Sequence, residues 1–470
     1  MGLLDRILNR QSKPKAQRML EATSGKRWTN TPPFGSIAAE VAGGASRVRG
    51  RARHLRHNDP LAANAAGIYR TALVGYGVTA ASQHSDAGTR TTIDEAFAAW
   101  AVKTKFAETQ AEVIDALVTD GEALVRMLTT DDGELRLQHI PAEQLDESLT
   151  VELGGGGYIA NGVEFSAGDE IVAYHIFSTR LTDIFPTTQT PVRVPAEDII
   201  HLFRRNGAGQ HRGLSWFAPV VLPLNELSQL QDALLVSAKI QAMMCGFIQD
   251  QNGTGTAFAD GPQTGTAMDL SLEPGTMRVL PSGYSVTFSN PAQMQQSVDF
   301  ATHSIRMIAA GLQIPEFLLS GDMRNVNYSS ARTALVQFRQ HLEAIQFTLL
   351  VPKFFGPVYR RWLTLANLTG SLDTGVDVPG VEWFFPAMPW IDPKKDADGT
   401  AAMISAGLMS RRQAVASLGF NVEKLDAEIA ADRQREQALG LSFEQSPAPA
   451  ATQSPAPAAT KEEKVNAEDE

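Results

Sequence analysis

The hydrophobic pattern is most regular between Ile314 and Leu350, where two predicted helices flank a short polar segment. The first helical run ends at Pro315, and the second is expected to begin at the Ser329–Ser330 pair, because serine is a common helix cap. Residues 321–330 between them are too polar to pack as core. Along the second helix, large apolar residues recur every three or four positions, which predicts one buried face. They are Leu335, Phe338, Leu342, Ile345 and Leu349.

Two more helices come before this segment and enclose an insert. The first covers residues 222–247 and carries Leu227, Leu230 and Leu234 as its apolar stripe. The second covers residues 295–312 and has a stripe of the same period. The insert is rich in Gly, Thr, Asp and Pro and ends in two short predicted strands. The middle of the chain is therefore expected to run helix, insert, helix, polar loop, long helix.

The N-terminal half predicts a mixed α/β region. A helix is expected from Ser46, and Asn58-Asp59-Pro60 should break it, because Asp caps a helix and Pro fits the first turn of the next one. Residues 91–120 predict a helical pair. Alternating apolar residues between Ala123 and Phe203 predict strands, with a hairpin turn at Asp132-Gly133.

The C-terminal part combines a bent helix, a strand and a second helical region. Pro352 and Gly356-Pro357 are expected to bend the long helix, because proline cannot continue the hydrogen-bond ladder. The aromatic residues Trp383–Pro386 predict a strand, and helices are expected to continue to about Gly440. The tail that follows is rich in Pro and Ala and acidic at its end, a composition that cannot bury enough surface to fold.

Composition limits the classes of function. Apolar residues make up 43% of the 470 residues, enough for packed cores. The single cysteine, Cys245, excludes a disulfide framework within the chain and suits a reducing compartment. No stretch approaches the roughly 20 apolar residues that a membrane span needs, so no membrane association is expected. The net charge of −11 argues against an ordinary DNA-binding protein, but not against one that surrounds DNA without gripping it.

A dense basic cluster lies on the helix expected from Ser46. It is either a solvated helix face or a contact with an acidic neighbour or with DNA. Its members are Arg47, Arg49, Arg51, Arg53 and Arg56.

Motifs for catalysis and metal binding are missing. Gly154–Gly157 lacks the Lys and the Ser or Thr that complete a phosphate-binding loop. The histidines on or beside strands, at His139, His175 and His201, have no cysteine partners and no zinc-site spacing. There is no G-x-S-x-G or H-E-x-x-H pattern either. The sequence therefore predicts no enzyme, no metal and no cofactor.

Five short motifs, in this order along the chain, resemble the lambda family of tailed-phage portal proteins. Each is weak alone, but the ordered set is specific, and it covers about residues 45–435. The motifs are Arg51–Asn64, Gly213–Pro219, Ile314–Arg332, Trp390–Lys395, and Gly407–Arg411 together with Gly419.

The resemblance implies a mixed α+β, mainly α, ring-forming portal fold. In the family's terms, the chain would comprise an arm, a wing, a two-helix stem, a clip insert, a tunnel loop, a long kinked helix and a helical crown. The expected boundaries are 1–45 for a basic arm, 46–221 for the wing, 222–247 for stem helix 1, 248–291 for the clip, 292–318 for stem helix 2, 319–329 for the tunnel loop, 330–394 for the long kinked helix with its return to the wing, 395–440 for the crown and 441–470 for a disordered acidic tail.

The function implied by the resemblance is that of a head-tail connector. A dodecameric ring at one vertex of the phage head would let double-stranded DNA pass during packaging and ejection. The implied partners are the major capsid and scaffold proteins, the large terminase and then a head-completion or tail adaptor. The protein would be made in the host cytoplasm and end in the virion. The alternatives are another ring or connector protein of the virion, and an enzyme.

The polar segment then becomes the candidate site. We expect Arg324, Asn325, Val326, Asn327 and Tyr328 to line the narrowest part of a DNA channel. Such a channel should avoid strong phosphate binding, because each tight contact would hold the moving DNA.

Overall fold

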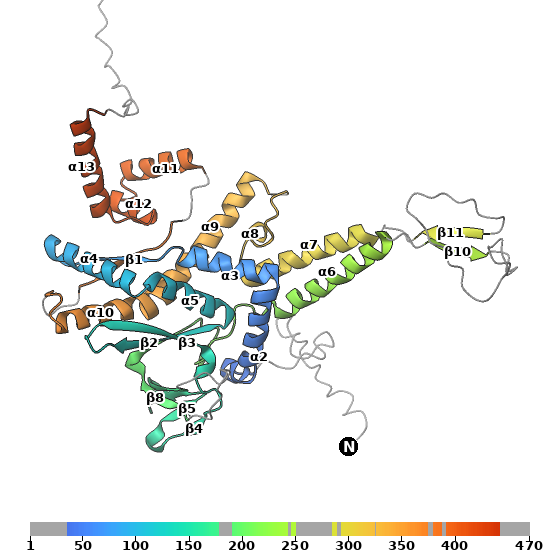
Figure 1. Ribbon diagram of the computed structural model, residues 1–470, viewed down its shortest axis with the longest axis horizontal. Coiled ribbons are helices and arrows are strands. Elements are labelled where there is room, and N and C mark those ends of the chain that lie inside the picture. Colours follow the sequence, from blue (N-terminus) through green and yellow to red (C-terminus); the bar gives the residue numbers. More distant parts are fainter. Residues whose placement is uncertain are drawn as a thin grey trace, which may run out of the picture. The chain divides into compact units, whose positions relative to one another are not determined.

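The computed structural model describes residues 35–177, 190–242, 246–250, 284–288, 293–324, 326–374, 379–387 and 392–441. Over these residues the fold is mixed α/β and mainly helical, as the sequence predicted (Figure 1). The chain divides into two compact units, Met1–Gly399 and Thr400–Glu470. Most of the predicted arm and clip, Asn325, and all but the first residue of the predicted tail lie outside the described residues.

The first described helix begins earlier than expected. Helix α2 (Ile37–Asn58) starts at the cap Ser36, whose hydroxyl accepts a hydrogen bond from the Ala39 N–H. The expected helix start at Ser46 is therefore wrong, and the helix extends into the range expected for the basic arm. A pair of glycines made this stretch resemble a loop, but the side chain of Val41 is buried and holds the turn in place. The predicted break at Asp59 is confirmed, because Asp59 caps α3 (Pro60–Leu73).

The predicted helical pair is α4 (Ala87–Lys103) and α5 (Phe106–Thr119). Its aromatic residues Phe97, Trp100 and Phe106 pack against one another in the core. The Trp100 indole also donates a hydrogen bond to the Leu135 carbonyl, which joins the pair to the sheet beside it. The packed aromatic rings and the hydrogen bond of the Trp100 indole together fix the helices on the sheet.

The predicted strands form two separate sheets. The first has the order β3-β2-β9, with β2 (Glu122–Thr129) and β3 (Leu135–Ile140) joined by the predicted hairpin and β9 (Ile199–Phe203) on the other side of β2. The second is a meander whose five strands follow chain order. Its strands are β4 (Val151–Glu152), β5 (Tyr158–Ala160), β6 (Val163–Phe165), β7 (Ile171–Ile176) and β8 (Val192–Pro195). Three short 3-10 segments, η3 (Ala142–Gln144), η4 (Gly154–Gly156) and η5 (Ala196–Asp198), connect them.

A third pairing joins distant parts of the chain. Strand β1 (Thr79–Ser82) pairs antiparallel with β12 (Val381–Phe384), the predicted aromatic strand. The sequence did not indicate β1, because its four small residues carry no alternating apolar pattern. The backbone groups of β1 find hydrogen-bond partners only when β12 pairs with it, so the strand depends on the tertiary structure.

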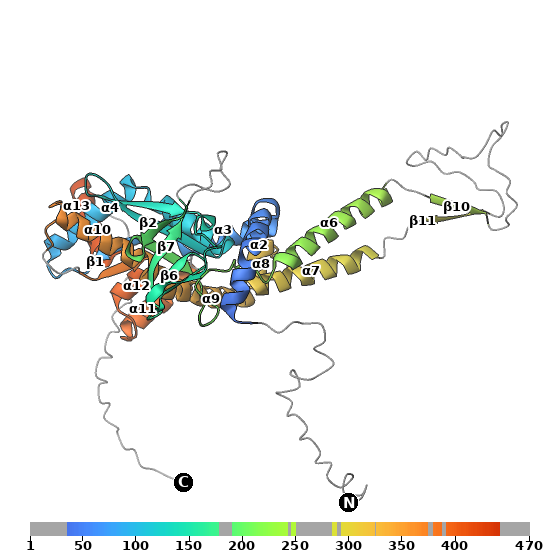
Figure 2. The ribbon, with the colours of Figure 1, turned by 90° about the horizontal axis from the view of Figure 1, so that it is seen from below.

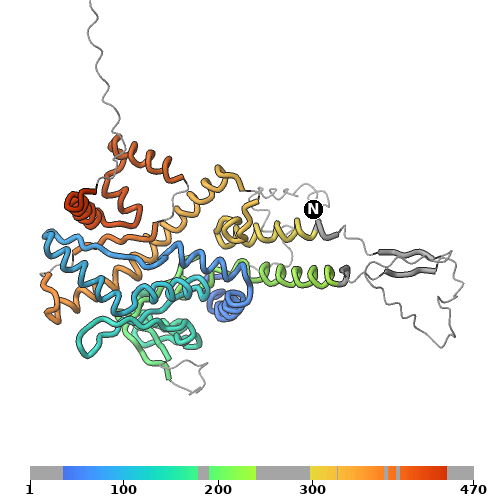
Figure 3. Tube along the Cα trace, turned by 45° about the horizontal axis from the view of Figure 1, so that its top comes forward, coloured from blue at the N-terminus to red at the C-terminus, as the bar shows by residue number. Residues whose placement is uncertain are grey.

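Two long helices lie side by side and run in opposite directions. These are α6 (Val221–Ala242) and α7 (Gln293–Leu312), green and yellow in Figures 1, 2 and 3. A Cβ atom on Gly311 would lie 2.5 Å from Val220 Cγ1, so the glycine allows α7 to approach the start of α6. Between them in the chain, β10 (Gly246–Asp250) pairs antiparallel with β11 (Tyr284–Phe288), which includes one of the two strands expected in the insert.

After α7 come α8 (Glu316–Ser320), α9 (Tyr328–Ile345), a π-helical segment η6 (Gln346–Phe355) and α10 (Gly356–Leu368). The predicted apolar stripe is buried from Phe338 in α9 to Leu349 in η6, whereas Leu335 is half-buried. Pro352 falls inside η6, where the backbone stays helical. The wider π turn, with the Gly356 N–H bonded to the Val351 carbonyl, replaces the ladder that proline cannot continue in an α-helix.

The main core joins α2 to α5, the adjoining ends of α6 and α7, and the run from α9 to α10. A smaller core lies between the other face of β2 and the five-stranded sheet. From Pro393 onward, α11 (Pro393–Ser405), α12 (Arg411–Ser417) and α13 (Val422–Leu439) confirm the helical region predicted up to about Gly440. No helix in the described part of the chain is long and apolar enough to cross a membrane.

Candidate functional site

The predicted site residues lie in the short connection between α8 and α9. Gly321 ends α8 with φ of 72°, a conformation that glycine adopts without strain. The Arg324 side chain follows and is 87% exposed. Its Nε and Nη2 atoms lie 2.9 and 2.7 Å from the two carboxylate oxygens of Asp322. The hydrogen bonds from Arg324 lower the pKa of Asp322 to about 2, so the arginine carries its own counter-charge.

The next residues start α9 rather than extend the loop. The Asn327 side chain accepts a hydrogen bond of 2.8 Å from the Ser330 N–H and is the helix cap. The expected cap at Ser329–Ser330 is therefore wrong, because the asparagine just before them satisfies the first free N–H groups. Val326 is half-buried, and Asn325 lies outside the described residues.

Tyr328 is half-exposed and is the first residue of α9. Lys395 Nζ lies 5.8 Å from the centre of its ring, and Arg332 Nη1 donates to its hydroxyl at 3.3 Å. Arg332 also pairs with Asp396 at 2.8 Å. The sequence analysis missed Arg332, Lys395 and Asp396 as neighbours of the loop, because no periodicity links α9 to the start of α11.

The loop can provide contacts but has no reaction centre. Its described groups are a paired guanidinium, a capping amide and a phenol, none of which is set up as a nucleophile beside a base. Across the described residues, no three His, Cys, Asp or Glu side chains are grouped so that they could hold a metal ion.

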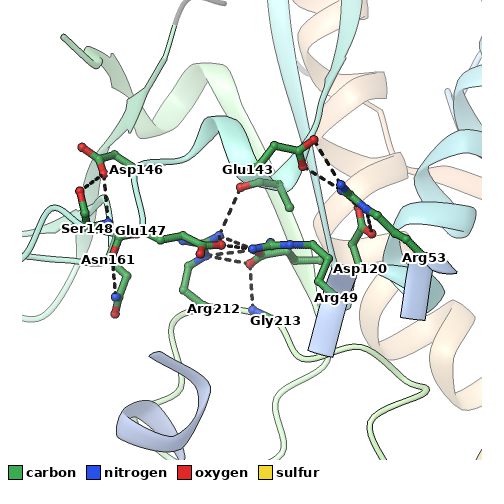
Figure 4. A network of polar contacts seen from close by, with 12 residues as sticks. Arg49, Arg53, Asp120, Glu143, Asp146, Glu147, Ser148, Asn161, Arg212 and Gly213 are labelled. Carbon is green, nitrogen blue, oxygen red and sulfur yellow. Dashed lines mark hydrogen bonds and ion pairs between the residues drawn. The ribbon is translucent and has the colours of Figure 1, made fainter. Parts of the chain in front are cut away.

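A second polar site, the Glu122 cluster, was missed by the sequence analysis. We use this name for Glu122, Arg49, His201, Arg212 and the Gly213 N–H. Glu122 begins β2, and its side chain is 1% exposed. Arg212 Nε lies 3.1 and 2.9 Å from the two carboxylate oxygens of Glu122, and the Gly213 N–H donates a hydrogen bond of 2.8 Å to the same carboxylate. Arg49 from α2 adds a contact of 3.3 Å, and Figure 4 shows both arginines converging here.

The charges in this cluster are balanced by direct pairing. Burial acts to raise the pKa of Glu122, but Arg212 and His201 outweigh burial and hold that pKa well below its usual value. Burial lowers the pKa of His201, so the ring is neutral at pH 7. His201 Nε2 lies 3.0 Å from Glu122 and donates to it as the neutral tautomer. A buried carboxylate is stable here because two arginines, His201 and the Gly213 N–H all contact it directly.

Two glycines permit this arrangement. Gly121 has φ of 90°, and a Cβ atom there would collide with the backbone of Leu214 and Ser215. A Cβ atom on Gly213 would collide with the Gly121 carbonyl. The two segments can therefore pack backbone against backbone only because both residues are glycine. This close approach brings the Gly213 N–H within reach of Glu122.

The arginines of α2 divide into two groups. Arg47 and Arg51 are exposed, as expected for a solvated face. The other three agree with the second interpretation, because they contact acidic neighbours, which lie within the same chain. Arg49 pairs with Glu122 and Glu147, Arg53 with Asp120 and Glu143, and Arg56 with Asp115. Figure 4 shows Arg53 beside Asp120 and Glu143.

Comparison with known proteins decides the family. Residues 23–346 match the model of the family described as phage portal protein, lambda family. The chain belongs to this family, and it is a portal protein. Both the Glu122 cluster and the loop from Asp322 to Tyr328 fall inside the matched region, whereas α10 to α13 lie beyond it.

Two relatives carry the portal name. The chain is 25% identical over 444 residues to a probable portal protein of Halomonas phage phiHAP-1, with 88% of this chain and 85% of the relative covered. It is 24% identical over 481 residues to portal protein B of Escherichia phage lambda, with 89% of each covered.

Solved structures with similarity include the neck of an empty GTA particle, at 14% identity and a TM-score of 0.47, with 88% of this chain and 96% of that chain covered. A portal protein of an HK97-family phage from Corynebacterium diphtheriae is 12% identical, with a TM-score of 0.29 and coverage of 62% and 85%. The portal family is a structural one.

Proposed function

We propose that this portal protein forms a dodecameric ring whose central channel conducts double-stranded DNA during packaging and ejection. The family match over residues 23–346 carries the proposal. In addition, the described elements follow the order of helix, insert, helix, loop and long helix that the sequence indicated. A ring needs two different complementary faces on each copy, which a chain of this size can supply.

The same order of elements supports an assignment of the parts of the ring. We assign residues 46–221 to the wing, α6 and α7 to the stem, residues 248–291 to the clip, and residues 395–440 to the crown. The clip would meet the large terminase and then a head-completion or tail adaptor. The wing and crown would lie toward the major capsid and scaffold proteins. The protein would assemble in the host cytoplasm and become part of the virion, without catalytic activity of its own.

The loop residues Arg324 to Tyr328 would line the narrowest part of the channel. The pairing of Arg324 with Asp322 supports this role, because a neutralised arginine can touch a phosphate without releasing many counterions. Capping by Asn327 and the contacts of Tyr328 hold the loop on the end of α9. A fixed loop of low net charge is compatible with DNA that moves past it. A patch of unpaired arginines would bind the phosphates and hold the DNA back.

Imaging of the purified protein tests this function. We expect negative-stain images to show rings with a central hole, and an averaged reconstruction to place residues 321–330 nearest the axis. A reconstruction with these residues on the outer rim would contradict the channel role of the loop. A protein that stays monomeric under all assembly conditions would contradict the ring.

A further inference from the structure

A pocket that belongs to neither polar site lies between α4, α10 and the tip of the β2–β3 hairpin. Its volume is about 290 Å³, at the lower end of the range for binding pockets, so it can take one or two side chains. In Figure 1 these three elements meet at the end of the first unit that lies opposite α6 and α7. The largest apolar residues of its lining are Trp100, Leu135, Trp362, Leu365 and Leu372.

The walls of this pocket are already in place. The Trp100 indole donates a hydrogen bond of 2.9 Å to the Leu135 carbonyl, and its ring centre lies 6.4 Å from that of Trp362. A Cβ atom on Gly133 would lie 2.5 Å from Thr369 Cγ2, so the hairpin tip packs closely on the end of α10. A preformed apolar pocket can be filled with little loss of conformational entropy.

Exposed apolar side chains lie next to the pocket. Val102, beside the lining residue Lys103, is 82% exposed, and Leu368, beside Thr369, is 77% exposed. Scattered apolar residues are normal on a surface, but two of them beside an apolar pocket indicate a surface that a partner covers. The partner must therefore offer apolar side chains.

The free charges around the pocket are acidic. Glu95 precedes the lining residue Ala96, and Asp131 and Asp132 precede Gly133 at the hairpin tip. All three acids are exposed, and none has an ion-pair partner among the described residues.

The basic residues of the neighbouring positions do not offset these acids. Three of them form ion pairs with acidic neighbours. The pairs are Lys103–Glu134, Lys105–Glu108 and Arg361–Asp198. Arg136 and Arg360 lie on the opposite faces of β3 and α10 from the pocket, by the side-chain periods of a strand and of a helix. The mouth of the pocket therefore favours a cationic partner.

The N-terminal segment of this chain has the matching composition. Residues 1–34 lie outside the described residues. The first 18 residues contain five basic residues and one acidic residue. Their apolar residues Leu3, Leu4, Ile7 and Leu8 are interleaved with Arg6 and followed by Arg10. The tail after Leu441 is acidic at its end, so the same acids would repel it.

We infer that residues 3–10 dock on this pocket, with an apolar side chain in the pocket and their two arginines beside Asp131 and Asp132. The 24 residues between Arg10 and Gly35 span up to roughly 80 Å when extended, more than the roughly 55 Å across a compact unit of this length, so the pocket is within reach. The inference goes beyond the proposed ring and does not depend on it. A docked segment cannot bind DNA at the same time, which agrees with a channel that avoids strong phosphate binding.

Photochemical cross-linking of the full chain tests where the segment lies. In a Cys245→Ser background, Ile7→Cys carries a benzophenone maleimide, so that an apolar group replaces the isoleucine. Illumination, digestion and mass spectrometry then map the adducts, within one chain or between copies. We expect at least half of them on α4, the hairpin tip and α10. A control label at Ser24→Cys, in a polar part of the same terminal stretch, should place at most a tenth of its adducts there. Equal distributions from the two labels would overturn the inference.

Filling the pocket provides a matched pair of variants. Ala99 lines the pocket, whereas Ala98 beside it does not, and both are exposed. Ala99→Phe should lower the yield of pocket adducts from the Ile7→Cys label at least fivefold, and Ala98→Phe should change it by less than a factor of about 1.5. Circular dichroism checks that both variants fold. The same yield in both would contradict docking in the pocket.

The acidic tip is tested by removing its charge. Asp131→Asn together with Asp132→Asn should lower the yield of pocket adducts at low salt at least threefold. The control is Glu152→Gln together with Glu170→Gln, two exposed acids of the five-stranded sheet, which should leave the yield unchanged. An unchanged yield in the hairpin variant would contradict the charge pairing that selects this segment.

Duplex DNA is the main rival for a basic segment. An excess of a short duplex should change the yield of pocket adducts by less than a factor of about 1.5. If the duplex removes these adducts, the segment binds DNA in preference to the pocket and the inference is overturned. Negative-stain images of the same sample report ring formation separately, so failure of the docking and failure of the ring are distinguishable.

Discussion

Arg324 is held by Asp322, two residues before it, through two side-chain hydrogen bonds of 2.9 and 2.7 Å. The Arg324 N–H also donates to the same carboxylate, at 3.0 Å. The pair is exposed, so it adds little to stability. Its consequence is electrostatic, because the most prominent cation of the candidate site is neutralised by its own loop.

Asp322→Asn should therefore make the loop hold DNA. Removal of the carboxylate frees Arg324, and the salt dependence of duplex retention by rings should steepen by about one unit for each arginine that meets a phosphate. Retention of a short duplex at several salt concentrations measures this. Adding Arg324→Gln should return the salt dependence to the wild-type level or below it. An unchanged dependence in Asp322→Asn would place Arg324 away from DNA.

Glu122→Gln should strongly destabilise the chain. The amide has the same shape but removes the buried counter-charge and leaves Arg49 and Arg212 to share the partly exposed Glu147. Removing one partner of a buried ion pair costs about 3–5 kcal/mol. Urea unfolding followed by circular dichroism would measure it. The control is Glu95→Gln on the exposed side of α4, which should change the unfolding free energy by less than about 0.5 kcal/mol. Equal effects would show that the Glu122 cluster contributes little.

Stability should fall on mild acidification, and His201 should contribute to the fall. Burial holds the folded-state pKa of His201 below its unfolded value of about 6.5. The unfolded chain therefore binds a proton first, and stability decreases as the pH falls below about 6.5. Burial also lowers the pKa of His211 and of His341, so all three histidines act in the same direction.

The variant His201→Gln isolates one of these contributions, because the amide can still donate to Glu122 but does not titrate. Its urea midpoint should fall less steeply than that of the wild type between pH 6.5 and 5. An identical slope would mean that His201 is not neutral in the folded chain. The carboxylate of Glu122 acts at lower pH: its pKa is depressed on folding, so its contribution is present above about pH 4.5 and is lost as the pH falls toward the folded-state pKa.

Two glycines that both have a positive φ angle provide a matched comparison. Gly121 and Gly155 have φ of 90° and 80°, but a Cβ atom would strike the backbone of Leu214 only at Gly121 and would meet open space at Gly155. Gly155→Ala should cost about 1–2 kcal/mol from the left-handed conformation alone. Gly121→Ala should cost about 1–3 kcal/mol more, because the packed backbone must move. Thermal unfolding compares the two, and equal losses would contradict the close approach.

Much of the local structure was predictable from the sequence, because it depends on neighbouring residues. The stripe from Leu335 to Leu349 predicts a buried helix face at α-helical spacing, and it is buried from Phe338 onward. Asp59 predicts a break because its carboxylate caps the next helix wherever that helix packs. Errors in the local structure are small, such as the start of α9, where Asn327 caps the helix instead of the serines two residues later.

Contacts between residues that are far apart in the sequence could not be predicted, because no periodic pattern along the chain marks them. Arg49 resembles Arg47 and Arg51 in the sequence, yet only Arg49 is turned toward Glu122, by the way α2 lies on the sheet. Strand β1 exists because β12 returns to it. The sequence by itself determined the helices, the hairpin, the absence of catalytic motifs and the family resemblance, all of which depend on short stretches. Only the tertiary structure decided which charges are buried, which helix faces are left uncovered and what holds the loop at Tyr328, since these depend on where separate elements come to rest.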